Sequence, residues 1–274
     1  MLQLDRYIEQ IEALLEDDTV SSLTYAALEC RLAIECVCYE RLKLALDFIS
    51  FDDLKKWQPK NVVNFLISEV DPHIASHMKL SISEDPVEHN LDQAGFEKLK
   101  YVLVGTQTGL NTNKLGKLWN ALSNVALHTR LPKTRDDKIA HYGEQSSIKK
   151  QVENCLEELK QISDGNLLMT SPEPQISVNC SCGKEIKRRI FNIKSGQIFH
   201  CNDPSCLETF EVKMDGDDMS FVPRRIELRC QSCGHKQIVP KKMAESMSTN
   251  QYIYFNCAGC DEKIHVHWRL MQGQ

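Results

Sequence analysis

The sequence predicts a multidomain, mainly α-helical protein, in which an N-terminal antiparallel helical bundle precedes small β-rich modules at the C-terminus. Apolar residues recur at helical spacing through most of residues 1–163. The connections between these patterns are mostly short, which favours antiparallel neighbours. Beyond this region the pattern changes to short strands beside close pairs of cysteines. We expect a helical domain over 1–163, a linker over 164–179, and two small modules over 180–222 and 223–274.

Composition is ordinary for a globular protein, with 42% hydrophobic and 26% charged residues and a net charge of −5. No apolar run reaches the roughly 18 residues needed to cross a bilayer. The N-terminal segment lacks the basic and apolar regions of a signal peptide. We therefore expect a cytoplasmic chain with no membrane partner.

The first helices follow from apolar spacing and from helix-end signals. We expect an amphipathic helix over residues 3–16 and a long helix over 22–48, which contains neither Gly nor Pro. Pro59 suits the first turn of a third helix, which ends before Asp71. Cysteines within the long helix are expected to be small buried residues, namely Cys30, Cys36 and Cys38.

The second half of the helical region is less regular. Alternation over residues 78–82 predicts a short extended segment, and residues 88–104 are expected to be helical. Asn111 can cap a further helix that runs to about His128, with Trp119 in its core stripe. A last helix is expected to start near Thr134, break at Gly143 and resume to about Ile162.

The segment from Arg135 to His141 combines a permanent cation with a titratable imidazole. Thr134 and Asp137 form the S/T-x-x-D pattern of a helix start, which would place Arg135 beside unpaired backbone N–H groups that can hold a phosphate. Asp137 precedes His141 by four residues and can orient its ring. On a straight helix the two side chains lie about 120° apart, so sharing one phosphate needs a long reach or a second subunit. The alternative is a solvated surface, since Asp136 and Asp137 repel an anion.

Arg31 and Glu35 stand four residues apart on one face of the predicted long helix. An exposed ion pair is the alternative to a functional role for them. Together with Arg135 and His141, which Gly143 follows, the segment Arg-Leu-Ala-Ile-Glu gives residues 1–163 a pattern that resembles the HEPN superfamily.

The resemblance implies a helical bundle that dimerises and, as in many members, a metal-independent ribonuclease. In such an enzyme Arg135 would stabilise the phosphate and His141 would transfer the proton, leaving a 2′,3′-cyclic phosphate. Glu35, Arg31 and Asp137 are lesser candidates for orienting the site. The resemblance also implies a role as a toxin or in antiviral defence. Other members of the superfamily are non-catalytic binding or assembly modules.

Eight of the twelve cysteines form two sets of four in the last hundred residues. Paired cysteines in a reducing compartment are typical of metal sites rather than of disulfides. Each set resembles a zinc ribbon that holds one structural zinc ion with a closed shell of four thiolates, which makes catalytic zinc a weaker alternative. In the first set His200 or Asp203 could replace a cysteine. The predicted ligands are Cys180, Cys182, Cys201 and Cys206 for the first ion and Cys230, Cys233, Cys257 and Cys260 for the second.

Short strands are expected to support these cysteines. Residues 185–193 and 197–200 are predicted to pair across a turn at 194–196. In the second module the predicted strands are 226–229, 236–239, 252–255 and 264–270. Gly234, directly after Cys233, can turn the chain so that backbone N–H groups face the thiolates.

Contacts of the two modules with nucleic acid or with a protein remain open at this point. Residues 175–274 carry 14 Lys+Arg against 11 Asp+Glu, and two zinc ions on eight thiolates would bring the balance to about −1. Net charge therefore does not argue for nucleic acid, and only local clusters can. The candidate nucleic-acid-binding residues are Lys187, Arg188, Arg189, Arg224 and Arg225, with stacking faces at Phe191, Phe199, Tyr252, Tyr254 and Trp268. Alternatively, the aromatic residues form small cores and the cations are solvated.

The function predicted from the sequence is a metal-independent endoribonuclease with zinc ribbons that bind RNA or a partner. RNA is the expected substrate, a homodimer through the helical domain is the expected assembly, and a protein partner or inhibitor is a further possibility. The alternative is a non-catalytic dimeric adaptor or regulator that binds nucleic acid or protein through its zinc ribbons. A third hypothesis, zinc-dependent hydrolysis, predicts that mild chelation abolishes activity before the fold is lost.

Overall fold

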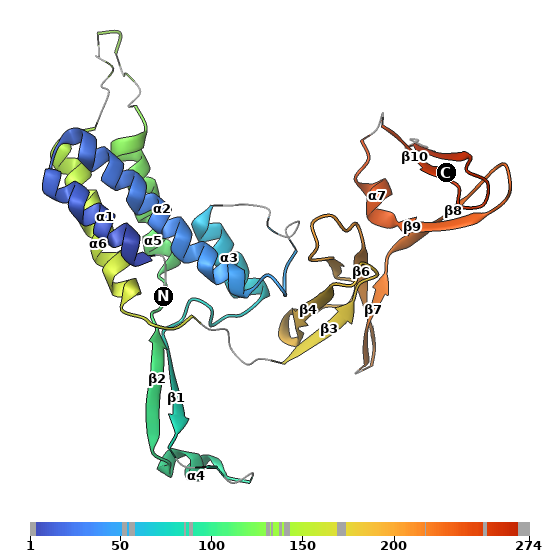
Figure 1. Ribbon diagram of the computed structural model, residues 1–274, viewed down its shortest axis with the longest axis horizontal. Coiled ribbons are helices and arrows are strands. Elements are labelled where there is room, and N and C mark those ends of the chain that lie inside the picture. Colours follow the sequence, from blue (N-terminus) through green and yellow to red (C-terminus); the bar gives the residue numbers. More distant parts are fainter. Residues whose placement is uncertain are drawn as a thin grey trace. The chain divides into compact units, whose positions relative to one another are not determined.

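The computed structural model describes most of the chain (Figure 1). Its described residues are 4–50, 54, 58–84, 86–87, 90–129, 132, 134–136, 139, 143–168, 174–216, 218–248 and 251–267. They divide into a helical unit, residues 1–45 and 56–172, and a cysteine-rich unit, residues 46–55 and 173–274. Among the described helices, none combines the length and apolar character needed to cross a bilayer.

Helices at the N-terminus pack around one core, as the apolar spacing predicted. They are α1 (Leu4–Asp17), α2 (Val20–Leu44), α3 (Pro59–Glu69), α5 (Thr112–Leu122), which continues as the π-helix η2 (Ser123–Leu127), and α6 (Gln145–Ser163). Leu23 and Ile34 from α2, Leu122 from α5, and Ile148 and Leu159 from α6 are fully buried in this core. Burial of such side chains is the main favourable term for the unit.

Two of the helix starts have the caps that polar residues can provide. The Thr19 hydroxyl accepts a hydrogen bond from the Ser22 backbone N–H at 3.1 Å, and the Ser22 hydroxyl accepts one from the Thr19 N–H at 3.0 Å. This capping box starts α2 before the predicted residue 22. The predicted cap at Asn111 is confirmed, since its side-chain oxygen accepts the Lys114 N–H at 2.9 Å.

The cysteines of α2 are largely buried small residues, as expected. Cys30 and Cys38 lie in the core, whereas Cys36 is half-buried. Burial raises the pKa of Cys38 to about 12. The pKa of Cys30 is raised first by its hydrogen bond with Cys155 of α6, and then by burial. These thiols therefore stay protonated and act as apolar packing groups.

The helix predicted over residues 88–104 is wrong. Among the described residues of this range the structure has the short helix α4 (Gln93–Lys98), followed by the strand β2 (Tyr101–Gln107). β2 pairs antiparallel with β1 (Met78–Ser83), the extended segment predicted from alternation. The run Tyr-Val-Leu-Val at the start of β2 has strong strand propensity, and a short apolar run cannot be assigned to helix or strand from its period alone.

Buried Arg41 links α2 to the two loops that enter and leave the β1–β2 hairpin. Its Nε donates to the Ile74 carbonyl at 3.2 Å and one terminal nitrogen donates to the Thr108 carbonyl at 3.0 Å. The side chain is almost fully buried, and this burial lowers the pKa of the guanidinium to about 10. Arg41 thus supplies hydrogen-bond donors to two loop carbonyls that flank the hairpin.

The cysteine-rich unit consists of small antiparallel sheets. β3 (Gln175–Asn179) pairs with β4 (Glu185–Arg189), and a three-stranded sheet contains β5 (Ile198–His200), β6 (Thr209–Asp215) and β7 (Asp218–Pro223). β8 (Arg225–Arg229) pairs with β9 (Lys236–Pro240), which leads into α7 (Lys241–Glu245). β10 (Tyr252–Asn256) pairs with β11 (Lys263–His267). The last four strands lie within the segments predicted for them or extend these by one residue.

Two predictions about the start of this unit need correction. The predicted linker 164–179 contains β3, so the first module begins before its first cysteine. The predicted strand 185–193 ends at Arg189, continues as the 3-10 helix η3 (Ile190–Asn192), and pairs with β3 instead of with 197–200. The reason is local: Cys180 and Cys182 lie in the tight turn between β3 and β4, where Gly183 has φ of +90°.

A short segment after α2 belongs to the cysteine-rich unit and not to the predicted helical domain 1–163. The predicted helix over 22–48 ends at Leu44. The Asp47 carbonyl accepts hydrogen bonds from the Lys187 backbone N–H at 3.1 Å and from the Asn202 side chain at 2.6 Å. Phe48 and Ile49 are buried. The cysteine-rich unit therefore draws part of its core from a distant stretch of sequence.

We predict that Arg41→Met lowers the free energy of unfolding of the helical unit by about 3 kcal/mol, because two loop carbonyls lose their donors. Lys43→Met on the same helix is the control, since Lys43 only pairs with Glu40 at the surface and should change stability by less than about 0.5 kcal/mol. Urea unfolding followed by helical circular dichroism measures both variants. Equal losses in the two would contradict the assigned role of Arg41.

Candidate metal centres

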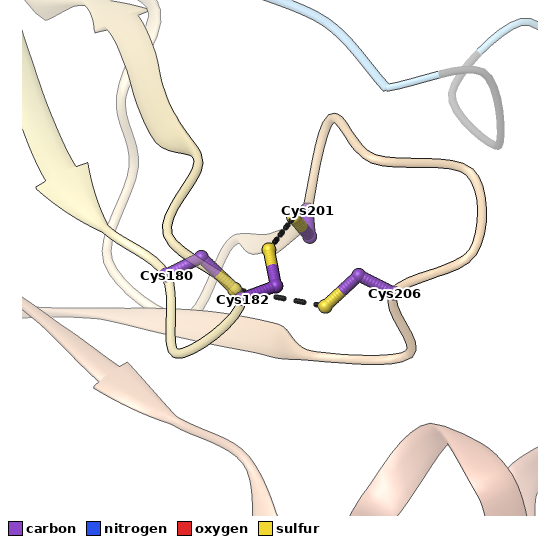
Figure 2. A group of neighbouring side chains, drawn as sticks. All are labelled: Cys180, Cys182, Cys201 and Cys206. Carbon is purple, nitrogen blue, oxygen red and sulfur yellow. Dashed lines mark hydrogen bonds between the residues drawn. The ribbon is translucent and has the colours of Figure 1, made fainter.

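The first set of cysteines forms one compact group. Cys180 and Cys182 come from the β3–β4 turn, and Cys201 and Cys206 from the loop after β5. Figure 2 shows the four side chains turned toward one another. The Sγ atoms of Cys180 and Cys206 are 3.7 Å apart, and those of Cys182 and Cys201 are 3.6 Å apart. All four sulfur atoms lie within 4.8 Å of one another.

The second set repeats this arrangement on other strands. Cys230 and Cys233 lie at the β8–β9 turn, and Cys257 and Cys260 at the β10–β11 turn. The sulfur atoms of Cys230 and Cys260 are 3.7 Å apart, and those of Cys233 and Cys257 are 3.6 Å apart. The predicted grouping of the eight cysteines into two sets of four is confirmed.

These spacings fit a tetrahedral metal ion. Four thiolates placed about 2.3 Å from a zinc ion are about 3.8 Å from one another. A disulfide would need sulfur atoms about 2.05 Å apart, and none of the eight cysteines is in one. Each group could therefore hold one metal ion, and a zinc ion is compatible with the donor set and its spacing.

Each backbone N–H that donates to a sulfur atom favours the thiolate form, although burial is the larger effect at Cys201 and raises the pKa of that thiol. The N–H groups of Asp203 and Gly259 donate to the sulfur atoms of Cys201 and Cys257 at 3.4 and 3.3 Å. Backbone hydrogen bonds from Cys233, and then from Ser232, lower the pKa of Cys230 to about 6. Such contacts orient and stabilise metal-binding thiolates.

Glycine at the predicted turn position has the expected conformation. Gly234 has φ of +76°, in the region that favours glycine. Its backbone N–H donates to the Cys230 carbonyl at 3.0 Å and so closes the turn between the two cysteines. The equivalent position of the first set, Gly183, is likewise left-handed. Both turns bring two cysteines close enough to share an ion.

Of the two alternative ligands of the first set, Asp203 is engaged elsewhere. One Asp203 carboxylate oxygen accepts hydrogen bonds from the Ser205 N–H and hydroxyl at 2.9 and 2.6 Å. Neither Asp203 nor His200 joins the group of four cysteines. Four sulfur donors complete a tetrahedron, which leaves no position for water or substrate. The donor set thus favours a structural over a catalytic ion.

The predicted nucleic-acid contacts at Arg188 and Arg189 lie in the interior of the unit. Both residues are buried, at 6% and 5% exposed. Arg188 lies 4.6 Å over the Phe199 ring and donates to the Lys187 and His200 carbonyls, and Arg189 lies 4.4 Å over the Phe48 ring. These contacts fill a small core with the flat guanidinium groups. The two side chains therefore cannot contact a ligand while this packing persists.

The other three predicted cations are paired within the chain. Arg224 makes two hydrogen bonds to the Glu245 carboxylate, at 3.0 and 2.6 Å. Arg225 pairs with Glu208 at 2.9 Å, and Lys187 approaches Glu185 at 3.6 Å and Asp47 at 4.0 Å. A polyanion would have to compete with these carboxylates, which weakens the prediction that this cluster binds nucleic acid.

The Arg135–His141 motif is described only in part. Arg135 is exposed and lies in a turn, so the predicted helix start at Thr134 is wrong, and α6 begins at Gln145. His141 and Asp137 lie outside the described residues. The helical spacing expected between the two catalytic candidates therefore does not hold at Arg135.

The structure brings Arg31 and Glu35 together on one aromatic side chain. The Trp119 indole N–H donates to the Glu35 carboxylate at 3.0 Å, and the Arg31 guanidinium lies 4.0 Å from the centre of the Trp119 ring. Both charged residues are half-buried, so the expectation of an exposed ion pair is wrong. The sequence predicted Trp119 only as a core residue. Trp119 lies 84 residues after Glu35, so no short motif could indicate this contact.

Comparisons of the chain with protein-family models, curated proteins and solved structures found no match. The resemblance of residues 1–163 to the HEPN superfamily therefore stays a prediction based on the motif residues. The two groups of four cysteines are supported by their geometry alone.

We predict that Cys257→Ser lowers the zinc content from two ions to one per chain, because three thiolates and a hydroxyl bind zinc far less tightly than four thiolates. Cys36→Ser is the matched control, because Cys36 lies in α2 and belongs to neither group. Inductively coupled plasma mass spectrometry of purified protein measures the content. Two ions in the Cys257 variant would contradict the assigned ligand set.

We predict that Arg188→Ala destabilises the cysteine-rich unit by about 2 kcal/mol, because it removes the contact with Phe199 and several hydrogen bonds. Lys213→Ala, at an exposed position of β6, should have little effect. Thermal unfolding of the zinc-loaded proteins measures both. Unchanged stability together with lost RNA binding in Arg188→Ala would restore its predicted role as a nucleic-acid contact.

Proposed function

We propose that the protein is a metal-independent endoribonuclease, in which the helical unit cleaves RNA and the two cysteine-rich modules hold RNA or a partner. The proposal combines the R-x5-H segment from Arg135 to His141 with one structural observation. This observation is the convergence of Arg31 and Glu35 on Trp119. Arg31 and Glu35 are the described residues among the lesser candidates for orienting the site, and their shared contact with Trp119 supports the proposal.

The Trp119 cluster lies on the same helical stretch as the contact made by Gly143. A Cβ atom at Gly143 would lie 1.8 Å from the Val125 carbonyl oxygen, so only glycine fits there. Val125 follows Trp119 by six residues, about 9 Å along a helix. Gly143 is the first described residue after the motif in the sequence, and its contact lies on the stretch that directly continues α5.

Arg31 is suited to such a site. Its Nε is buried without a hydrogen-bond partner among the described residues. A buried guanidinium nitrogen without an acceptor is costly, which is typical of a group kept for a ligand or for a neighbouring side chain. A phosphate oxygen or a carboxylate could accept from it.

The proposed reaction needs no metal. The ribose 2′-oxygen attacks the adjacent phosphorus and its proton passes to His141. The bond from phosphorus to the 5′-oxygen breaks, and that oxygen takes a proton from solvent water, which leaves a 2′,3′-cyclic phosphate and a 5′-hydroxyl. A histidine that titrates near its usual pKa of about 6.5 can carry this proton near neutral pH. The Arg135 guanidinium would offset the charge that builds up on the phosphate oxygens.

Zinc would then have a structural role in this protein. We propose that the two groups hold zinc ions, that the N-terminal helices form the antiparallel bundle of a mainly α-helical domain, and that the protein works in the reducing cytoplasm, where eight thiols stay available. When bound, the two ions would cross-link strands of a unit with little apolar core.

A non-catalytic dimeric adaptor is the second candidate, and a specific surface favours it. Tyr25, Leu28 and Leu32 lie on one face of α2 and are 60%, 38% and 37% exposed. An exposed apolar stripe of this kind is typical of a protein interface. The same stripe could serve dimerisation in the ribonuclease, so only an activity measurement separates the two candidates.

We predict that the purified protein cleaves single-stranded RNA in EDTA, and that His141→Ala and Arg135→Ala each lower the rate by at least about 100-fold. His128→Ala is the matched control, because His128 is exposed after η2 and lies outside the motif. Chromatography of the products tests for the 2′,3′-cyclic phosphate.

Equal cleavage by the wild type and the motif variants would contradict the assigned residues. An inactive but folded and zinc-loaded wild type would instead favour the adaptor. Loss of cleavage on mild chelation, before any loss of helical signal, would support zinc-dependent hydrolysis.

A further inference from the structure

The β10–β11 hairpin has two unlike faces. Alternate residues of a strand point to opposite faces, and directly paired residues share a face. The register pairs Tyr252 with His267, Tyr254 with His265, and Asn256 with Lys263. These six side chains therefore form one face, which we call the tyrosine–histidine ladder. The opposite face carries apolar residues that are half-buried, namely Ile253, Phe255, Ile264 and Val266.

The ladder exposes aromatic surface in a regular array. Tyr252 and Tyr254 are 73% and 59% exposed. The Tyr252 and His267 ring centres are 5.8 Å apart, and those of Tyr254 and His265 are 6.3 Å apart. The two tyrosines are separated by two residues of extended chain, about 6.8 Å. Two rows of rings thus stand side by side on an open sheet surface.

Positive charge lies on the same face. The Lys263 ammonium is 4.5 Å from the centre of the Tyr254 ring. Among the described residues it makes no ion pair, and β10 and β11 contain no carboxylate. The two histidines add further hydrogen-bond donors to this face. The nearest acidic residues in sequence are Asp261 and Glu262, which lie in the β10–β11 turn directly before Lys263.

The neighbouring β8–β9 hairpin provides a contrast within the same unit. Its exposed cations include Lys236, which pairs with Glu227 at 2.9 Å, and Arg225, which pairs with Glu208. Two of the three exposed cations of this hairpin are therefore paired within the chain, the third being Arg229, and its strands contain no aromatic residue. The ladder combines an unpaired cation with exposed aromatic rings. Exposed aromatic surface of this kind is typical of a binding site.

We propose that the tyrosine–histidine ladder binds single-stranded nucleic acid, with bases stacked on Tyr252 and Tyr254 and phosphates contacted by Lys263 and the histidines. Exposed rings take up unpaired bases irrespective of sequence, and adjacent cations follow the backbone. A duplex offers no free base faces along its length, so single strands are favoured. The proposal deepens the proposed function by naming where RNA is held, and binding can be measured apart from cleavage.

The test uses full-length, zinc-loaded protein and fluorescence anisotropy with a labelled 12-nucleotide oligothymidylate. DNA lacks the 2′-hydroxyl that cleavage requires, so the probe reports binding even if the protein is no ribonuclease. Tyr252→Ala and Tyr254→Ala should each weaken binding about tenfold, and Tyr254→Phe should bind like the wild type because it keeps the ring. Tyr101→Ala is the matched control at an exposed tyrosine of β2.

Binding that is unchanged in both alanine variants, with two zinc ions retained, would overturn the proposal. So would equal affinity for a duplex of the same length, or no binding of oligothymidylate or of the matching oligouridylate by the wild type. Protein capture on the ladder would then be the better explanation. A third outcome separates the two proposals. If the wild type does not cleave RNA but the tyrosine variants lose oligothymidylate binding as expected, the proposed catalysis is overturned and the ladder assignment stands.

Discussion

Convergence of four sulfur atoms at each of two points is the constraint on which the cysteine-rich unit depends. Around the first group, the buried cluster consists of Cys180, Ile186, Cys201 and Phe210. In the described part of residues 225–267, the buried apolar residues are Cys230, Val239, Met247 and Cys257. Half of each set is a cysteine, so the ligand sulfur atoms stand where a larger domain would place leucine or phenylalanine. A core this small gives little stability by itself, so a metal ion bound at each group would add to the stability of the folded unit.

Cations in this unit contribute to the structure before they can contribute to recognition. Arg188 and Arg189 lie flat on phenylalanine rings, and Arg224 and Arg225 are held by carboxylates. The alkyl stems and flat guanidinium groups supply area that the sparse apolar residues do not. The aromatic face of the last hairpin is exposed and is not covered by such internal contacts among the described residues. A basic run in a small metal-dependent domain is thus weak support for a nucleic-acid site unless its partners are known.

Features that depend on residues close in sequence were predictable here, and features that depend on distant partners were not. The pairs around Cys230 and Cys257 sit on local turns, and the Asn111 cap spans three residues, so both followed from spacing. Arg189 packs on Phe48, and Trp119 donates to Glu35. Neither contact could be predicted, because each partner lies far away in the sequence. The hairpin at 78–107 was missed in part because four apolar residues in a row fit a helix as well as a strand.

Assignment of residues 46–55 to the cysteine-rich unit has a consequence for synthesis of the protein. Phe48 and the Asp47 carbonyl meet partners that lie at least 140 residues further along the chain, namely Lys187, Arg189 and Asn202. At about 5–20 residues per second, the ribosome delivers those partners roughly 7–28 seconds later. During that interval the helices on either side can pack while the short segment between them stays uncovered. A chaperone would have a defined apolar target there until the first module closes.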